Sequence, residues 1–371
     1  MPDTTVPAGI TGYLERHRVD AARVVPLTGD ASDRRYFRVI PRSGPSFVLA
    51  LYATPFDYAT LPFVNVTSLF EAMSVPVPRL LGDAGDLGVL ALQDLGDVTL
   101  QAQLGAASAD ERDRWYAHAA DLLVTLQRRG RELADSRYVP YGIAFDVEKL
   151  TWEMDFFTRH FVEAYRGLEL PPAARDALRS ALAAIVGELA AEPRVLCHRD
   201  YHSRNLMVAG DALYVIDFQD ARMGPDTYDL VSLLRDSYVD LPEALVDRVM
   251  TRFASAIGAR DVDAFRDRFD LMAMQRNLKA LGTFGYQAVT RANPVYAQYV
   301  PRTLLYVRDN LARHRRFDRL GEILTTVLPE LRNAGPEGPA LRDDTVTPQA
   351  SSPEPASVSK PSASAKATAD T

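Results

Sequence analysis

The sequence predicts an α+β protein with two lobes, a small antiparallel β-sheet lobe over residues 1–93 and a larger helical lobe over residues 94–332. Two observations lead to this prediction. Short runs rich in β-branched and aromatic residues, separated by Gly and Pro turns, fill most of the first lobe and are typical of strands. From Asp110 onward, apolar residues recur at the spacing of amphipathic helices. Residues 333–371 contain no aromatic residue and are rich in Pro, Ser, Ala and Thr, so we expect a disordered tail.

The first lobe is expected to contain five strands and two helices. The strands are expected over residues 24–28, 34–40, 46–52, 79–81 and 89–92, and the helices over residues 8–19 and 56–74. Pro62 lacks a backbone N–H, so it must lie in the first turn of the second helix or divide that helix. Side chains alternate along a strand, so Arg35 and Arg38 are expected on opposite faces of the second strand.

The second lobe is expected to be mostly helical. Ser108 and Glu111 have the spacing of a capping box, which indicates the start of a long helix. Further helices are expected over residues 146–166, 172–190, 227–238, 242–257, 261–281, 295–314 and 318–328.

The composition is that of an ordinary globular protein, with 47% apolar and 25% charged residues. The net charge of −7 does not favour nucleic-acid binding. No apolar run approaches the roughly eighteen residues of a membrane span, and we expect no membrane or signal segment. The single cysteine, Cys197, excludes an internal disulfide and fits a cytoplasmic location. No obligate protein partner is evident.

Residues 195–218 organise the second lobe. They contain His198, Asp200 and Asn205 in the spacing H-x-D-x-x-x-x-N, followed after twelve residues by Asp217. A Gly-Asp turn between two apolar runs predicts a hairpin that gathers these polar residues around one small volume. An aspartate that accepts a hydroxyl proton, and oxygens that hold Mg2+, are what phosphoryl transfer from ATP needs. The alternative interpretation is a polar loop before a buried strand.

These residues also carry a resemblance to a known family. The chain resembles the kinase-like aminoglycoside phosphotransferase superfamily in three segments, Cys197-His-Arg-Asp-Tyr-His-Ser-Arg-Asn-Leu, Ile216-Asp-Phe-Gln-Asp-Ala and Tyr228-Asp-Leu-Val-Ser-Leu-Leu-Arg-Asp-Ser. Within that superfamily it is most similar to the bacterial cell-wall sugar kinases that phosphorylate the anomeric hydroxyl of N-acetylmuramate and N-acetylglucosamine. The resemblance implies a two-lobed protein-kinase-like fold that binds ATP and Mg2+ between the lobes.

The resemblance assigns roles to the polar residues of these segments. Asp200 is expected to orient the acceptor hydroxyl and take its proton, while His198 braces the loop. Asn205 and Asp217 are expected to hold Mg2+. Asp229 is expected to support the catalytic loop from below.

The resemblance also implies a nucleotide site. Residues from three loops are expected to contact ATP, namely Gly29, Asp30, Ala31, Ser32, Gln93, Leu95 and His202. The first four form a turn over the phosphates, the next two pair with adenine through their backbone, and the histidine faces the γ-phosphate.

One departure from the family pattern concerns the lysine of the third strand, which holds the α- and β-phosphates in kinase-like folds. Residues 1–148 contain no lysine. Arg34, Arg35 and Arg38 are the nearest cations by sequence, and arginine can bind phosphate through two hydrogen bonds. We expect Arg35, or failing it Arg38, to carry part of the phosphate contact.

The acceptor is expected to bind beside the catalytic loop, through Arg204, Asp220, Arg235 and Asp236. The arginines favour an acceptor that bears a carboxylate, such as N-acetylmuramate. A helical segment with Arg276 and Lys279 also resembles the sugar-kinase pattern, and a solvated helix face explains it equally well. Two alternatives stay open, a kinase of another small acceptor such as an aminoglycoside, choline or homoserine, and a non-catalytic nucleotide-binding regulator.

Overall fold

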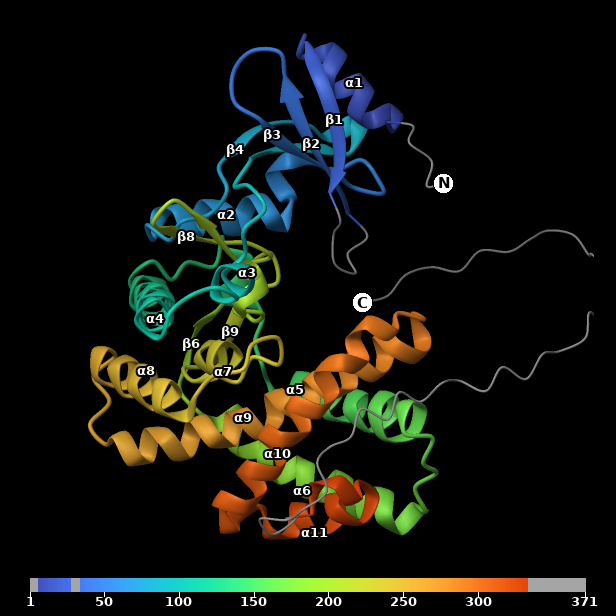
Figure 1. The fold of residues 1–371 in the computed structure, drawn as a ribbon, viewed down its shortest axis with the longest axis vertical. Helices are drawn as coiled ribbons and strands as arrows, with labels where there is room; N and C mark the ends of the chain where they lie inside the picture. The colour runs from blue at the N-terminus through green and yellow to red at the C-terminus, as the bar shows by residue number, and fades with distance from the viewer. Residues whose placement is uncertain (1–5, 28–33, 333–371) are drawn as a thin grey trace, which may run out of the picture. The chain divides into compact units, whose positions relative to one another are not determined.

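Residues 6–27 and 34–332 are described by the computed structural model. The turn of Gly29, Asp30, Ala31 and Ser32 and the tail of residues 333–371 lie outside the described residues, so what was expected of them stays a prediction. Along the described part, a five-stranded antiparallel sheet is followed by a mostly helical lobe (Figure 1). This arrangement confirms the predicted α+β fold class.

The sheet of the first lobe has the strand order β1-β2-β3-β5-β4, with antiparallel neighbours throughout. Its strands are Ala21–Leu27 (β1), Arg35–Pro41 (β2), Phe47–Leu51 (β3), Leu80–Ala84 (β4) and Val89–Gln93 (β5). Consecutive strands lie beside each other except at β4, because the chain returns through β5 in the middle of the sheet. The sheet ends at Gln93, the residue before the predicted start of the second lobe.

Helices cover both faces of this sheet. α1 (Ala8–Arg16) buries Ile10 against Phe37 of β2 on one face. α2 (Pro62–Ala72) buries Phe70 on the other face, in the cluster that continues into the second lobe. Side-chain alternation along the strands allows one sheet to supply both contacts.

The second helix is shorter than the expected range of residues 56–74. It begins at Pro62 and is preceded by a 3-10 turn over Tyr58–Thr60. Proline suits the first helical position, because the N–H that it lacks has no partner within the helix there. The carboxylate of Asp57 accepts a hydrogen bond from the Ala59 N–H at 3.0 Å and stabilises the preceding turn.

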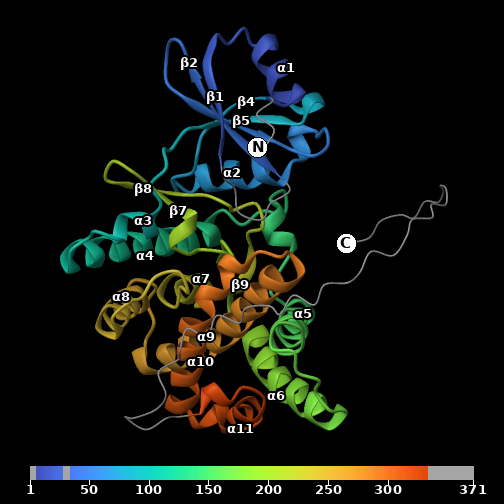
Figure 2. The same cartoon turned by 45° about the vertical axis from the view of Figure 1, so that its right-hand side comes forward.

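Two small strand pairs lie where the second lobe meets the first. β6 (Arg194–Cys197) pairs with β9 (Arg222–Pro225), and β7 (Leu206–Ala209) pairs with β8 (Ala212–Val215). The β7–β8 pair is the predicted hairpin, and Gly210 adopts a φ of 63° at its turn, a conformation that glycine tolerates. Figures 1 and 2 both show α2 between the large sheet and this hairpin.

Helices surround these strands. They are Leu100–Leu104 (α3), Ala109–Glu132 (α4), Val147–Phe157 (α5), Pro172–Ala191 (α6), Tyr228–Leu234 (α7), Glu243–Ala256 (α8), Val262–Gly285 (α9), Val300–Arg313 (α10) and Asp318–Val327 (α11). α4 begins with the predicted capping box of Ser108 and Glu111. α7 ends earlier than expected, because Asp236 accepts a hydrogen bond from the Tyr238 N–H and closes a turn instead. None of the helices in the described ranges could cross a bilayer.

α9 packs closely against α5 and the segment that follows it (Figure 1). Gly285 makes this approach possible, because a Cβ at this position would lie 2.3 Å from the carbonyl oxygen of His160. Both helices continue in π geometry, α5 over Thr158–Tyr165, which contains His160, and α9 over Tyr286–Thr290. π-helical turns are frequent at functional sites, and the second of these turns borders the cleft described below.

Gly285→Ala should destabilise the protein, because the new methyl group meets backbone that cannot move as a side chain can. Overpacking of this kind should lower the free energy of unfolding by about 1–3 kcal/mol. Gly187→Ala is the matched control, since a Cβ there meets no atom within 4 Å on an exposed face of α6. The control should be neutral or raise stability by up to about 1 kcal/mol. Urea unfolding of both variants tests this, and equal stabilities would contradict the close approach.

Candidate active site

The loop of residues 198–205 joins β6 to β7 and is held by a carboxylate beneath it. Asp229, fully buried at the start of α7, accepts hydrogen bonds from the backbone N–H groups of His198 (2.6 Å) and Arg199 (3.0 Å). Burial raises the pKa of Asp229, and the neighbouring His198 and the two N–H donors act in the opposite direction. Arg199 has a φ of 89°, a strained conformation that the two bonds help to maintain. This geometry is what a supporting role for Asp229 requires.

His198 is fully buried and uses both ring nitrogens within the fold. Its Nδ1 accepts a hydrogen bond from the Asp200 N–H at 3.2 Å, which places the ring proton on Nε2. Nε2 then donates to the carbonyl of Ile216 at 3.0 Å. His198 therefore links the loop to the strand end before Asp217, in the position expected of a bracing residue.

Asn205 and Asp217 line the same cleft and offer oxygen atoms to it. The amide nitrogen of Asn205 donates to the Asp200 carbonyl at 2.9 Å, so the amide oxygen is the atom left for a cation. Asp217 follows β8 with a φ of 62°, and its half-exposed carboxylate accepts a hydrogen bond from Gln219 at 2.9 Å. Two protein oxygens suit Mg2+, which keeps waters and binds substrate phosphates. Across the described residues, no group of three or more His, Cys, Asp or Glu side chains could hold a metal.

The cleft has a volume of about 1200 Å³ and is lined by both lobes. Its end beneath the sheet is apolar, and is formed by Leu27, Val48, Leu92, Met207 and Ile216. Gln93 and Leu95 also line the cleft, and their contact with adenine stays a prediction. The Gln93 N–H donates to the Arg79 carbonyl at 2.9 Å, so this N–H is already used within the sheet.

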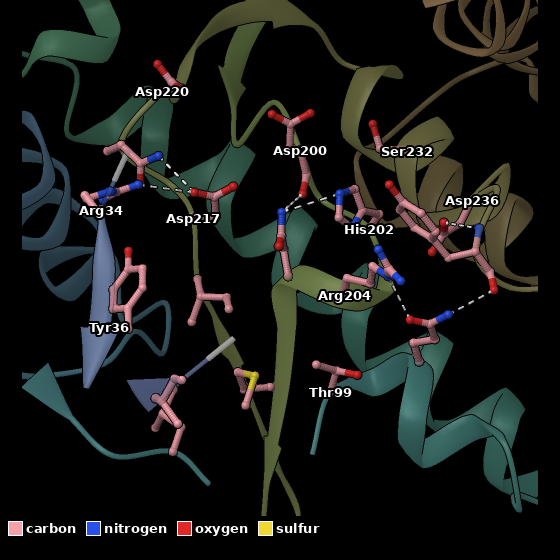
Figure 3. A pocket seen from close by; sticks show the side chains of 18 of the residues that line it. Arg34, Tyr36, Thr99, Asp200, His202, Arg204, Asp217, Asp220, Ser232 and Asp236 are labelled. Carbon is pink, nitrogen blue, oxygen red and sulfur yellow. Dashed lines mark hydrogen bonds and ion pairs between the residues drawn. The ribbon is translucent and has the colours of Figure 1, made fainter. Parts of the chain in front are cut away.

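The arginine of the first lobe that reaches the phosphate end of the cleft is Arg34. Figure 3 shows its side chain directed toward Asp217, and the ion pair measures 3.6 Å. Arg35 lies on the opposite face, where its guanidinium stacks 5.7 Å from the Phe37 ring centre. Arg38 faces the cleft but forms ion pairs with Asp94 and Asp97 at 2.8 Å each. This placement differs from the expected one, because strand alternation turns Arg35 away from the cleft.

Three cations from two elements surround Asp200. Its carboxylate lies 3.4 Å from the Lys279 ammonium, 3.7 Å from Arg199 and 3.8 Å from Arg276. Burial acts to raise the pKa of Asp200, and these positive charges outweigh it and hold the pKa well below its ordinary range. Asp200 is therefore ionised at neutral pH and can accept a hydrogen bond from a hydroxyl group.

Lys279 and Arg276 were not assigned to the site from the sequence. Both lie on α9, far along the chain from Asp200, and the structure buries most of each side chain in the cleft wall. Their three-residue spacing was the available signal, since it places both on one helix face. A solvated face has the same spacing, so only the packing of α9 distinguishes the two interpretations.

His202 borders the cleft near Asp200 but does not supply a charge there. Burial lowers its pKa, so the imidazole is neutral at pH 7. Its Nδ1 is buried without a hydrogen-bond partner among the described residues, and its ring meets Tyr238 edge-on at 5.2 Å. The contact expected between His202 and the γ-phosphate stays a prediction, and in it the imidazole would be neutral.

The end of the cleft beyond Asp200 is aromatic and polar. Tyr238, Phe284 and Tyr296 supply rings, and Asn277 and Gln287 supply amides. The amide nitrogen of Asn277 is buried and lacks a hydrogen-bond partner within residues 6–27 and 34–332. Aromatic rings and amides are suited to a small polar ligand with apolar faces.

The four residues expected to bind the acceptor all line the cleft, and the structure gives each a partner within the protein. Arg204 stacks 4.1 Å from the Tyr238 ring centre and donates to Gln101. Arg235 pairs with Glu243, and Asp236 accepts from the Ser203 N–H at 3.0 Å. Asp220 is half-exposed and pairs with Arg199 at 2.8 Å. Contact of these residues with an acceptor stays a prediction.

Comparisons with known proteins agree with this geometry. Residues 23–268 match the phosphotransferase enzyme family. The chain is 33% identical over 315 residues to the N-acetylmuramate/N-acetylglucosamine kinase of Pseudomonas aeruginosa. The aligned region covers 83% of this chain and 90% of that protein. The kinase of the same name from Pseudomonas putida is 33% identical over 82% of this chain and 88% of that protein.

A solved structure extends the comparison to the fold. The ADP-bound aminoglycoside phosphotransferase APH(2'')-Ib aligns with a TM-score of 0.54 and 14% identity, over 81% of this chain and 98% of that chain. At this identity the likeness concerns the fold alone, and it confirms the two-lobed kinase-like architecture predicted from the sequence.

Asp200→Asn should lower turnover at least about a hundredfold, because the variant loses the carboxylate that accepts the hydroxyl proton. Affinity for ATP should stay nearly unchanged. Asp211→Asn is the control, since Asp211 is exposed at the β7–β8 turn. A coupled assay of ADP release measures turnover, and retention of more than about a tenth of the wild-type rate would exclude the base role.

Arg34→Met should weaken ATP binding, because it removes the cation that approaches Asp217. The loss of a hydrogen bond to a charged group should cost about 1.5–3 kcal/mol. Arg35→Met, one residue away on the opposite face, is the matched control and should bind ATP like the wild type. Calorimetric titration with ATP and Mg2+ distinguishes them, and a larger loss in the Arg35 variant would restore the expectation from sequence.

Proposed function

Because this chain belongs to the phosphotransferase enzyme family, we propose that it is an ATP-dependent kinase of amino sugars. It transfers the γ-phosphoryl group of ATP to the anomeric hydroxyl of N-acetylmuramate or N-acetylglucosamine and releases the sugar 1-phosphate. The observation that carries the proposal is 33% identity over 83% of the chain to a kinase named for these two sugars. We place this reaction in peptidoglycan recycling and in the cytoplasm.

The nucleotide end of the cleft supports ATP as the phosphate donor. A flat base fits between the apolar side chains of β1, β3, β5, β7 and the segment after β8. The phosphates then extend toward Asp217, where Arg34 supplies positive charge. Asn205 and Asp217 would hold Mg2+, which when bound neutralises negative charge on the phosphate oxygens.

Asp200 performs the proton transfer in the proposed reaction. The acceptor hydroxyl donates a hydrogen bond to the ionised carboxylate, and its oxygen attacks the γ-phosphorus. The bond from this phosphorus to the bridging oxygen breaks, ADP leaves with the electron pair, and the hydroxyl proton passes to Asp200. A carboxylate with a lowered pKa is a weak base, and the loose transition state of phosphoryl transfer requires little deprotonation before attack. A hemiacetal hydroxyl is more acidic than an ordinary alcohol and suits this base.

The acceptor end of the cleft supports a sugar that carries an amide. Aromatic rings such as Tyr238 and Phe284 can pack against the apolar face of a pyranose. The buried amide nitrogen of Asn277 is a donor available to an acetamido oxygen. A hydrogen bond between the Asn277 amide and the acetamido group fixes the orientation of the sugar. Its free-energy cost is small, because this part of the site is already polar.

The charges near Asp200 argue against the runner-up acceptors. Lys279, Arg276 and Arg199 lie within 4 Å of its carboxylate. Aminoglycosides and choline are cationic, so these charges would repel them at the reacting hydroxyl. N-acetylmuramate carries a carboxylate and N-acetylglucosamine is neutral, so both are compatible with the cleft.

With Mg2+ and ATP, N-acetylmuramate and N-acetylglucosamine should each yield a sugar 1-phosphate. Their methyl glycosides should be inert, because C1 is blocked while every other hydroxyl is kept. Phosphorus NMR of the products identifies the modified position. Phosphorylation of a methyl glycoside at the rate of the free sugar would place the chemistry at another hydroxyl.

Kanamycin and choline serve as competing acceptors in the same assay. Turnover of either compound, with both amino sugars inert, would favour the kinase with another acceptor. ATP binding without turnover of any acceptor would favour the non-catalytic regulator.

A further inference from the structure

Lysine is rare in this chain, and one lysine lies at the reacting end of the cleft. The sequence contains four, of which Lys149 and Lys279 belong to the described residues. Lys149 lies outside the cleft, with its ammonium 4.1 Å from the Trp152 ring centre. Lys279 lines the cleft, and its side chain is only 18% exposed. Burying a lysine is costly, so its position calls for a partner.

The partner in this structure is the carboxylate of Asp200. The Lys279 ammonium lies 3.4 Å from Asp200 Oδ1, and Arg276 lies 3.8 Å from the same oxygen. Arg276 also donates a hydrogen bond to the Tyr228 hydroxyl at 3.0 Å and stacks on that ring. Arg276 is therefore anchored to α7, while the ammonium of Lys279 donates to Asp200, which lines the cleft.

The distance between Lys279 and Asp200 brings the ammonium close to the phosphate being transferred. A hydroxyl that donates to Asp200 lies about 2.7 Å from its oxygen. The attacked phosphorus lies about 3–3.5 Å beyond that hydroxyl oxygen in a reactive arrangement. A cation next to Asp200 on a flexible four-carbon chain can therefore reach an oxygen of the transferred group.

Other cations lining the cleft are placed for different contacts. Arg34 pairs with Asp217 at 3.6 Å. Arg38 pairs with Asp94 and Asp97, and Arg235 pairs with Glu243. His202, which follows Asp200 by two residues, meets the Tyr238 ring edge-on at 5.2 Å.

We infer that Lys279 binds the γ-phosphoryl group during its transfer, and so supplies from α9 the positive charge that β3 does not provide. The inference rests on the proposed kinase function. Lys279 contacts the equatorial oxygens of the phosphoryl group while the bond to ADP breaks and the bond to the acceptor oxygen forms. It gives up no proton, because the hydroxyl proton passes to Asp200. A fixed cation at developing charge stabilises the transition state without reorganisation.

An alternative role for Lys279 is recognition of the carboxylate of N-acetylmuramate. N-acetylglucosamine lacks that carboxylate, so it separates the two roles. Loss of a phosphoryl contact should lower the turnover of both sugars equally, whereas loss of a carboxylate contact should lower that of N-acetylmuramate alone.

The test measures binding of a mimic of the transferred group. ADP is titrated by calorimetry into full-length protein with Mg2+, aluminium fluoride and saturating N-acetylglucosamine. Lys279→Met should weaken this complex by about 10- to 100-fold, the effect of removing one hydrogen bond to a charged group. Binding of ADP with Mg2+ alone should stay unchanged. Turnover of both sugars should fall by about a hundredfold or more, with little change in KM for the sugar.

Two further variants complete the test. Lys279→Arg keeps the charge and should recover part of the affinity for ADP with Mg2+ and aluminium fluoride. It also replaces the Met variant in the test if that variant fails to fold. Lys149→Met, the matched control outside the cleft, should behave like the wild type. The inference would be overturned if Lys279→Met bound ADP with Mg2+ and aluminium fluoride as tightly as the wild type. A loss of turnover confined to N-acetylmuramate would overturn it as well. A wild-type protein that turns over neither sugar would instead overturn the proposed function.

Discussion

The two hydrogen bonds from the backbone of residues 198–199 to Asp229 are the constraint on which the site depends. They hold Arg199 at a positive φ and so direct the following Asp200 into the cleft. The imidazole of His198 extends the same support to the strand end before Asp217. The carboxylate is buried, and loss of it would leave two donors without partners, at a cost of about 1–3 kcal/mol each. The position of the reacting carboxylate is thus determined from beneath the loop.

The second constraint is electrostatic. A buried carboxylate at a phosphate-binding site is repelled by the phosphates, so positive charge must lie close to it. Here that charge comes from both sides, with Arg34 beside Asp217 and with Lys279 and Arg276 beside Asp200. The consequence is a weak base in a strongly positive environment, which suits a reaction that depends on positioning and charge stabilisation more than on proton abstraction.

Much of the fold and the centre of the site could be predicted from the sequence, because their signals are local. The capping box of Ser108 and Glu111, the hairpin with its turn at Gly210 and the change from strand to helix periodicity each depend on neighbouring residues. The spacing of Asp200 and Asn205 before the hairpin likewise placed them on one loop, since a short chain has few ways to connect them. Local conformational preference and side-chain alternation suffice for these features.

Tertiary structure decided what depends on elements distant in the sequence. The sequence offered three nearby arginines and favoured Arg35, whereas in the folded protein Arg34 pairs with Asp217 and Arg35 lies over Phe37 on the opposite face. Lys279 entered the site because α9 packs against α5 and α7. Gly285, which lacks a Cβ, allows the same helix to lie close to the segment that follows α5. A helix face that is solvated and one that lines a cleft have the same periodicity. Their difference lies in which surface covers them, and that is determined by packing between segments far apart along the chain.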